Sequence, residues 1–449
     1  MSRPPIILPL VFAGLAFTAA TFLVSDTGEF WVSAAGRWML NHHAVPRENL
    51  WSITEPTHPW VFHEWLFGVP FAWLMEHVGV GGLPLLTLAM VTAVFGFSLR
   101  FTRHRPWLFA LAVVCFSMRL VTPRPTHLAL IFPFWLWWLL DAPLTRGRVV
   151  SVLLVEWLWA NSHGSFVVGW ALIALKLFEV GVKRSRWVAL LAGAIGITFL
   201  NPYGAGLHAL VADYFAGASA SAQVIHEHIR EFRPLWSDGD FLYSRATAAL
   251  VMVLAAACRA LWLPAFRARA LLAIALIVQA VLHVRHRELA GLLGCVLLLP
   301  AWPSKTHAPS FSNAWVLLPG LLLGLGCWGA AWLRHRSDEE WVSRELGGAD
   351  VVTLARALPD DARVVTEFPA SGLVLWYGAE RGVRVLMDAR NDCYSAETAK
   401  LAFDLEDGAA PISRLSEIGV THALVKDDSP LAVLNAEQSA GAWSIRRVP

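Results

Sequence analysis

The sequence has few charged residues and few cysteines. Charged side chains make up 16% of the 449 residues, and a net charge of +2 is too small to indicate a nucleic-acid partner. Cys393 stands alone and the other cysteines lie in apolar segments, so neither a disulfide framework nor zinc-ligand spacing is present. These absences exclude a nucleic-acid-binding protein and a secreted domain held together by disulfides.

Apolar residues and tryptophan dominate instead. Hydrophobic residues make up 56% of the chain, which holds 23 tryptophans, and the mean hydropathy is +0.51. Apolar runs of about 18 or more residues recur, as they do in proteins that cross a bilayer several times. Indole rings favour the water boundary of a bilayer. We therefore predict a mainly α, polytopic helical membrane protein.

The positions of lysine and arginine predict the orientation, because cytoplasmic loops are enriched in both. We interpret residues 7–25 as an uncleaved span rather than a signal peptide, since only Arg3 precedes them and no convincing cleavage site follows. With Arg3 inside, the inner loops are basic. About eleven spans are predicted: residues 7–25, 82–99, 107–120, 126–140, 149–160, 165–180, 187–200, 243–263, 270–284, 289–303 and 314–333.

One pair of these spans has an alternative. Residues 149–180 as a single tilted helix would reverse everything downstream and place the basic residues 183–186 outside. We prefer two short helices that meet at a protein-lined or watery cavity, where irregular backbone is tolerated inside a membrane.

The predicted topology divides the chain into a transmembrane domain, residues 1–336, and an extracytoplasmic domain, residues 337–449, with a bend at Gly347 and Gly348. Alternating segments predict a small α/β fold for the second domain. Its predicted strands are residues 363–368, 383–388, 420–426 and 443–448, and its predicted helices are residues 371–378, 395–405, 411–418 and 430–438. Asp388, Arg390 and Asp392 follow a strand, where they can bind a ligand or form caps and ion pairs.

Residues 26–65 form a polar first outer loop before an amphipathic helix at residues 64–78. The loop combines ionisable side chains with tryptophans at a membrane surface, where acid/base or phosphate chemistry is possible. Its acids also have structural explanations, as the polar end of a span or as favourable charge in a first helical turn. The candidate site residues in it are Asp26, Glu29, Arg37, His63 and Glu64.

Further polar groups interrupt the apolar runs on the same predicted outer side. Arginine outside runs against the positive-inside trend, and its forked guanidinium suits two-point binding of phosphate. The same arginines can instead reach lipid headgroups, and the amide and imidazole groups can satisfy backbone at helix breaks. The candidate substrate-binding residues are Arg119, Arg124, Asn161, His163, Arg285, His286 and Arg287.

Several motifs together resemble a family. They include Asp26 after the first span, Gly36-Arg37-Trp38, His63-Glu64-Trp65-Leu66, Trp159-Ala160-Asn161-Ser162-His163-Gly164, Asn201-Pro202-Tyr203-Gly204 and Asp388-Ala389-Arg390-Asn391-Asp392-Cys393-Tyr394. In these motifs the chain resembles, over nearly its whole length, a largely uncharacterised group of bacterial membrane proteins in the GT-C glycosyltransferase superfamily. Asn49 departs from the pattern, which has an aspartate there.

The resemblance implies transfer of a sugar from a polyprenyl-phosphate donor to a glycan, lipid or protein acceptor at the outer face of the inner membrane. Such a reaction needs a base for the acceptor hydroxyl and cations for the leaving lipid phosphate. By resemblance, Asp26 is the base or a ligand of a divalent metal, with Glu29 and Glu64 as further acids. The arginines would bind the phosphate.

Two other function classes stay open. A transporter also needs broken helices and buried charges, but its sites usually lie at the midplane between repeated halves, and no internal repeat is visible here. A non-catalytic scaffold that binds lipid or glycan is the third possibility.

His226-Glu227-His228 has metal-ligand residues, but the spacing puts both histidines on one face only in a strand, so we assign no metal there.

Overall fold

The structure is a computed structural model that describes residues 6–102, 105–120, 125–179, 184–217, 219–237, 244–301, 313–335, 337–390 and 392–449, without the side chains of residues 117–119 and 125. The chain forms two compact units, each described here by itself. Unit 1 contains Met1–Phe22, Pro84–Gly204 and Ile229–Ala331. Unit 2 contains Leu23–Leu83, Ala205–His228 and Trp332–Pro449.

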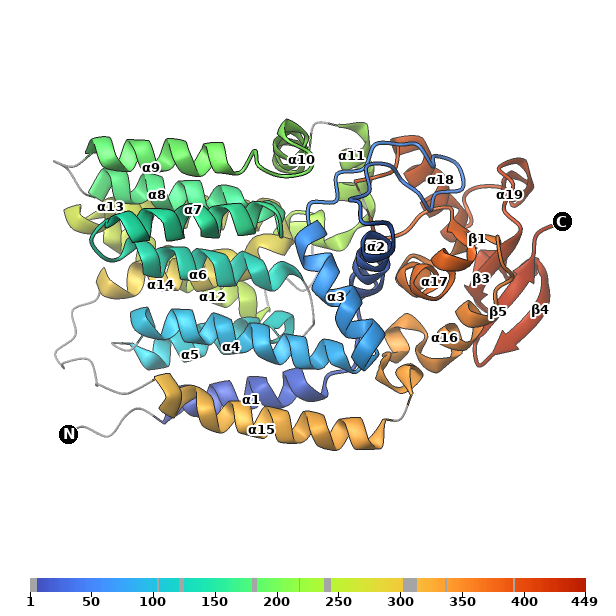
Figure 1. The fold of residues 1–449 in the computed structure, drawn as a ribbon, viewed down its shortest axis with the longest axis horizontal. Coiled ribbons are helices and arrows are strands. Elements are labelled where there is room, and N and C mark those ends of the chain that lie inside the picture. Colours follow the sequence, from blue (N-terminus) through green and yellow to red (C-terminus); the bar gives the residue numbers. More distant parts are fainter. Residues whose placement is uncertain are drawn as a thin grey trace. The chain divides into compact units, whose positions relative to one another are not determined.

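Unit 1 is a bundle of apolar helices. In chain order they are α1 (Ile7–Thr21), α4 (Gly82–Thr102), α5 (Pro106–Leu120), α6 (Leu128–Leu140), α7 (Arg146–Ala160), α8 (Val167–Glu179), α9 (Arg184–Ile197), α12 (Arg245–Leu261), α13 (Arg267–Leu282), α14 (Arg287–Leu298) and α15 (Asn313–Arg334). Helices α6 to α9 run side by side (Figure 1). These helices lie close to the predicted spans. A helix satisfies its backbone polar groups within the segment, so each long apolar run forms one.

Glycines set the closest helix approaches in unit 1. A Cβ on Gly320 of α15 would lie 2.5 Å from a ring carbon of Phe12, and one on Gly324 would lie 2.9 Å from Leu88. The Gly320-x-x-x-Gly324 pair therefore lets α15 pack closely against its neighbouring helices. Among the described helices, Gly82–Thr102, Pro264–Leu282 and Asn313–Arg334 are long and apolar enough to cross a membrane. The count of about eleven spans stays a prediction.

Unit 2 combines helices with one small sheet. Its helices are α2 (Gly28–His42), α3 (Trp65–Val78), α10 (Ala205–Ala216), α11 (Ala220–His228), α16 (Gly348–Ala357), α17 (Ser371–Gly378), α18 (Ala396–Glu406) and α19 (Ser413–Glu417). Its strands are β1 (Arg363–Thr366), β2 (Arg384–Val385), β3 (His422–Lys426), β4 (Asn435–Ala440) and β5 (Trp443–Arg447). The mainly helical class with a small C-terminal sheet is confirmed.

The sheet has the order β2-β1-β3-β5-β4, in which β1 runs parallel to β2 and β3, and β5 runs antiparallel to β3 and β4. The helix predicted at residues 430–438 is wrong. Residues Pro430–Val433 form a short 3-10 turn, and Asn435–Ala440 pairs with β5 as an edge strand. Ala436 and Glu437 favour a helix by propensity, but hydrogen bonding of this segment to β5 outweighs that preference.

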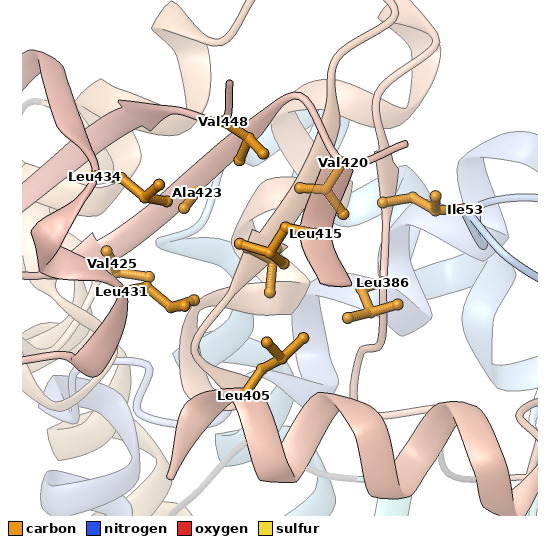
Figure 2. Packing of buried hydrophobic residues seen from close by; sticks show 11 residues of the cluster. Ile53, Leu386, Leu405, Leu415, Val420, Ala423, Val425, Leu431, Leu434 and Val448 are labelled. Carbon is orange, nitrogen blue, oxygen red and sulfur yellow. The ribbon is translucent and has the colours of Figure 1, made fainter. Parts of the chain in front are cut away.

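The first outer loop differs from the prediction as well. Gly28–His42 is a helix, α2, because its apolar residues recur at helical spacing. The next residue, His43, ends the helix in the left-handed region at φ 50°. The remaining residues extend the sheet: Ser52 bridges Val385 in parallel, and Val385 N–H donates to the Trp51 carbonyl at 2.8 Å. Ile53 packs into the domain core beside Leu386 and Val420 (Figure 2).

The compact units therefore do not follow the predicted boundary at residue 336. The outer loop shares a unit with the α/β elements, since it supplies both an extra edge to β2 and a side chain to their core. Gly347 and Gly348 both have positive φ, at 91° and 57°, so the chain does bend at that pair.

Candidate functional site

Asp26 lies directly before α2 in unit 2. Its Oδ1 accepts a hydrogen bond from Gly28 N–H at 2.7 Å, which satisfies one of the free amides of the first helical turn. The carboxylate is half-buried, and it faces the end of α2 where the helix dipole favours negative charge. The backbone hydrogen bond therefore fixes the orientation of the Asp26 carboxyl group at the start of α2.

Glu29 lies one residue into the same helix and is fully buried. Neither of its carboxyl oxygens has a hydrogen-bond partner in the described part of the protein. Burial raises the pKa of Glu29 well above its ordinary value, although its own backbone amide opposes the shift. Burial thus favours the protonated form of Glu29 over the carboxylate that a general base needs.

Helix α2 is fixed by close contacts on two sides. A Cβ on Gly36 would lie 2.0 Å from the Gly68 carbonyl of α3, so the two backbones touch at this crossing. At its start, Thr27 Oγ1 accepts from Gly372 N–H at 2.7 Å, which joins α2 to α17. Figure 1 shows α17 beside α2. The acids of the first turn therefore sit on a rigid element.

His63 and Glu64 stand just before α3, beside an acid from the other end of the chain. His63 Nε2 lies 3.6 Å from Glu64 Oε1, and its Nδ1 lies 3.8 Å from Asp392 Oδ2. The Tyr214 ring of α10 meets the imidazole edge-on, with centroids 6.3 Å apart. An imidazole between two carboxylates can accept, hold and pass a proton. Three segments thus converge on one acid/base cluster in unit 2.

A buried ion pair supports the Asp392 segment. Asp388 Oδ2 accepts from Arg390 Nη2 at 2.7 Å and from the Tyr394 hydroxyl at 2.6 Å, and both charged side chains are fully buried. The guanidinium carbon of Arg390 lies 4.7 Å from the Trp51 ring centre and 4.8 Å from that of Trp60. Burial raises the pKa of the Tyr394 hydroxyl, and the Asp388 charge adds to the shift. This network is structural, since every Asp388 oxygen is paired.

Asn49, where the resembling group has an aspartate, is buried and donates from Nδ2 to the Cys393 carbonyl at 2.8 Å. A neutral amide suits this position, because an aspartate could not donate to a carbonyl. Asn49 therefore ties the outer loop to the segment that carries Asp392.

Arg37 belongs to a different part of unit 2. It donates to the Trp376 carbonyl, lies 4.0 Å from the centre of the Trp376 ring, and pairs with Glu380 at 3.4 Å. Burial lowers the pKa of Arg37, and the Glu380 charge opposes that shift. The structure thus places Arg37 with Glu380 rather than with His63 and Asp392.

In unit 1, Asn161 and His163 fill a helix break between α7 and α8. Asn161 Nδ2 donates to the carbonyls of Trp157 at 2.8 Å and Leu200 at 3.3 Å. His163 Nδ1 accepts from Ser165 N–H at 3.1 Å, where the next turn begins. Both side chains are buried and satisfy backbone groups, which is the structural explanation open from the sequence.

Arg285, His286 and Arg287 lie at the short turn between α13 and α14, also in unit 1. Val284 N–H donates to the Arg233 carbonyl at 3.1 Å, and the Arg285 guanidinium lies 4.4 Å from the centre of the Phe232 ring. Arg287 Nε lies 3.7 Å from Glu288. This turn meets the turn of residues 230–233, which carries Arg230 and Arg233.

Sequence reasoning missed Arg230 and Arg233, although the stretch Arg230-Glu231-Phe232-Arg233 in a predicted outer loop carried the signal. Of the remaining candidates, the Arg119 side chain and all of Arg124 lie outside the described residues. Asp26, Glu29, Arg37, His63 and Glu64 belong to unit 2, and the other described candidates belong to unit 1.

A metal is not supported by the residues that the structure describes. Among them, no group of three or more histidine, cysteine, aspartate or glutamate side chains is placed to hold an ion. His226 and His228 lie on helix α11, where a spacing of two residues turns them to different faces. We therefore derive no step through a metal.

Comparison with known proteins decides the fold. No protein-family model and no curated protein matches the chain. Two crystal structures of ArnT from Cupriavidus metallidurans do match: one bound to undecaprenyl phosphate, with 15% identity and a TM-score of 0.53, and one in the apo state, with 14% identity and a TM-score of 0.52. Each match covers 98% of this chain and 97% of the other.

The chain has a GT-C-like fold. The family resemblance of its sequence motifs is thereby confirmed for the fold, over almost the whole length. Sequence identities this low support a shared arrangement of helices but not a shared chemistry. The activity therefore has to be argued from the side chains.

Proposed function

We propose that this protein is an integral membrane glycosyltransferase that moves a sugar from a polyprenyl-phosphate donor to an acceptor at the outer face of the bacterial inner membrane. The observation that carries the proposal is the near-complete match to a fold that was crystallised with undecaprenyl phosphate. Three helices suited to crossing a membrane and the acid/base cluster of unit 2 support it.

Asp26 is the proposed general base. In the reaction, the Asp26 carboxylate takes the proton of the acceptor hydroxyl while that oxygen bonds to the sugar C1. The bond between C1 and the donor phosphate oxygen breaks, and its electron pair leaves with the polyprenyl phosphate. Glu29, in which burial favours the protonated form, is not the proposed base. His63 and Glu64 would relay the proton to water.

The cationic turn of unit 1 is the proposed phosphate site. Arg285 and Arg287 lie on this turn, and Arg230 and Arg233 lie on the turn that contacts it, so these turns supply guanidinium groups suited to binding a phosphate. Cations stabilise a leaving phosphate most as its charge develops, so they act on the transition state more than on the bound donor. Asn161 and His163 fix the helix break between α7 and α8.

The test follows release of free polyprenyl phosphate from a lipid-linked sugar, with the full chain purified into nanodiscs and a bacterial envelope extract as acceptor. Asp26→Asn should lower the single-turnover rate by about 100-fold or more, within the range for a lost general base. Asp428→Asn, an exposed acid of the same unit, is the matched control and should leave the rate unchanged.

Other outcomes would separate the competing functions. Movement of solute across a vesicle membrane without release of polyprenyl phosphate would favour a transporter. Tight binding of the lipid-linked sugar with no turnover would favour a scaffold. An Asp26→Asn variant that is folded, inserted in the membrane and fully active would reject Asp26 as the base while leaving the transferase intact.

A further inference from the structure

Unit 2 contains an open pocket of about 530 Å³ that the proposed chemistry does not use. It lies between the C-terminal half of α2 and the turn that leads from α17 to β2. Its volume is in the range of roughly 300–1,000 Å³ that small-molecule sites occupy. The lining that matters here comprises Arg37, Trp38, Asn41, Trp51, Glu380 and Arg384.

The polar groups of this pocket are fixed in place. Glu380 Oε1 accepts from Asn41 Nδ2 at 2.6 Å and lies 3.4 Å from Arg37 Nε. Arg37 is held in turn on the face of Trp376. One wall of the pocket thereby carries hydrogen-bond donors and an acceptor. Because these side chains are already held, a ligand that binds there pays less entropy for ordering them. Glu380 offsets the charge of Arg37, and Arg384 leaves the lining with one further positive charge.

An aromatic ring stands beside these polar groups. Trp38 stacks on His42 one helical turn later, with ring centres 4.4 Å apart and planes 12° apart, and His42 Nδ1 contacts the Trp38 carbonyl at 2.9 Å. The stack leaves a rigid, half-exposed indole at the pocket. Trp51 contributes a second, mostly buried ring.

We infer that this pocket binds a sugar ring of a glycan. A pyranose has an apolar face of C–H groups that packs on an indole ring, and a rim of hydroxyls that both donate and accept hydrogen bonds. The pocket offers an indole in Trp38, a carboxylate acceptor in Glu380 and amide and guanidinium donors in Asn41 and Arg37. A prenyl chain would leave these polar groups without hydrogen-bond partners.

The role of the bound sugar rests on the proposed function. If the protein is a glycosyltransferase, the bound ring belongs to the acceptor or product glycan. The binding itself needs no donor and no turnover. The two ideas can therefore fail separately.

The experiment is retention of the full chain in nanodiscs on an array of bacterial envelope oligosaccharides. Wild-type protein should be retained on one group of related glycans, and Trp38→Ala should weaken that binding about tenfold or more, as loss of an aromatic contact does. Asn41→Ala changes an exposed side chain and should weaken the same binding without affecting folding.

Helix α3 provides a matched control. Trp73 stacks on His77 with centres 4.6 Å apart and planes 22° apart, the same arrangement as Trp38 and His42 but outside the pocket. Trp73→Ala should therefore leave glycan retention unchanged. Retention of no glycan, or equal retention by wild type, Trp38→Ala and Asn41→Ala, would overturn the inference. Retention that depends on Trp38 in a protein without transferase turnover would uphold the pocket and reject the proposed function.

Discussion

Asp388 and Glu29 are both buried acids of unit 2, and their surroundings are opposite. Asp388 is paired with Arg390 and with the Tyr394 hydroxyl, whereas neither oxygen of Glu29 has a hydrogen-bond partner among the described residues. The first arrangement holds the outer loop and the α/β elements together. The second leaves a buried carboxyl group without a partner, which disfavours its charged form and lowers the stability of the fold.

This difference shows which buried acidic side chains have a structural role. A buried acid whose oxygens are all hydrogen-bonded stabilises one conformation. Its removal leaves a buried positive charge without a counter-charge. A buried acid without partners has no structural role that a neutral side chain could not fill. Three substitutions test this contrast, from the largest expected effect to the smallest.

Asp388→Asn should have the largest effect. The substitution leaves the Arg390 guanidinium buried without its counter-charge, and the loss of one partner from such a pair costs about 3–5 kcal/mol. Thermal unfolding in detergent, followed by gel filtration, should show a much lower Tm or no folded protein. Asp404→Asn removes the exposed partner of Lys400 and should cost below about 1 kcal/mol. Equal effects of the two changes would break the contrast.

Gly36→Ala should have an intermediate effect. Its methyl group would overlap the Gly68 carbonyl, so α2 and α3 must move apart at a cost of about 1–3 kcal/mol. Because α2 carries Glu29, the same shift should also let water reach that carboxyl. Tm measurement checks the first expectation. Gly147→Ala in α7, where nothing lies within 4 Å of the new methyl, is the control and should not lower the Tm.

Glu29→Gln should have the smallest effect at low pH and a growing one at high pH. The folded state holds a proton that the unfolded chain loses near pH 4.5, because burial raises the pKa of Glu29. The free energy of unfolding of the wild type therefore falls as the pH rises from about 4.5 toward the raised pKa. The glutamine variant lacks this loss, so its Tm should exceed that of the wild type at pH 8 and match it near pH 4.

Glu397→Gln is the matched control for that titration, since Glu397 occupies the same first-turn position in α18 but is exposed. It should leave the pH dependence of the wild-type Tm intact. If Glu29→Gln keeps the full wild-type slope, Glu29 is ionised when folded and the contrast with Asp388 fails.

Much of the fold could be predicted because its signals are local. Apolar runs placed α4, α5 and α15 almost to the residue, and the pattern of residues 371–378 predicted α17 with its observed bounds. Strand β4 could not be predicted, because its exposed residues Asn435–Ala440 have no strand pattern and pair only since β5 lies beside them.

The candidate site was predictable in composition but not in grouping. The sequence indicated His63 and Glu64 together, and it indicated Asp392 separately, as the end of a strand. Only the fold brings Asp392 within 3.8 Å of His63. Arg37 shows the reverse, since it stands in the same loop as His63 but contacts Glu380.

The sequence by itself determined the helical membrane class, the positions of most helices and a family resemblance over nearly the whole chain. These follow from hydrophobic periodicity and from motifs that need no knowledge of distant residues. Tertiary structure alone decided that the first outer loop extends the sheet at β2, that Asp388 is paired while Glu29 is not, and that Trp38 and Glu380 share a pocket. Such facts depend on contacts between residues some 340 positions apart, as between Arg37 and Trp376, which no local pattern encodes.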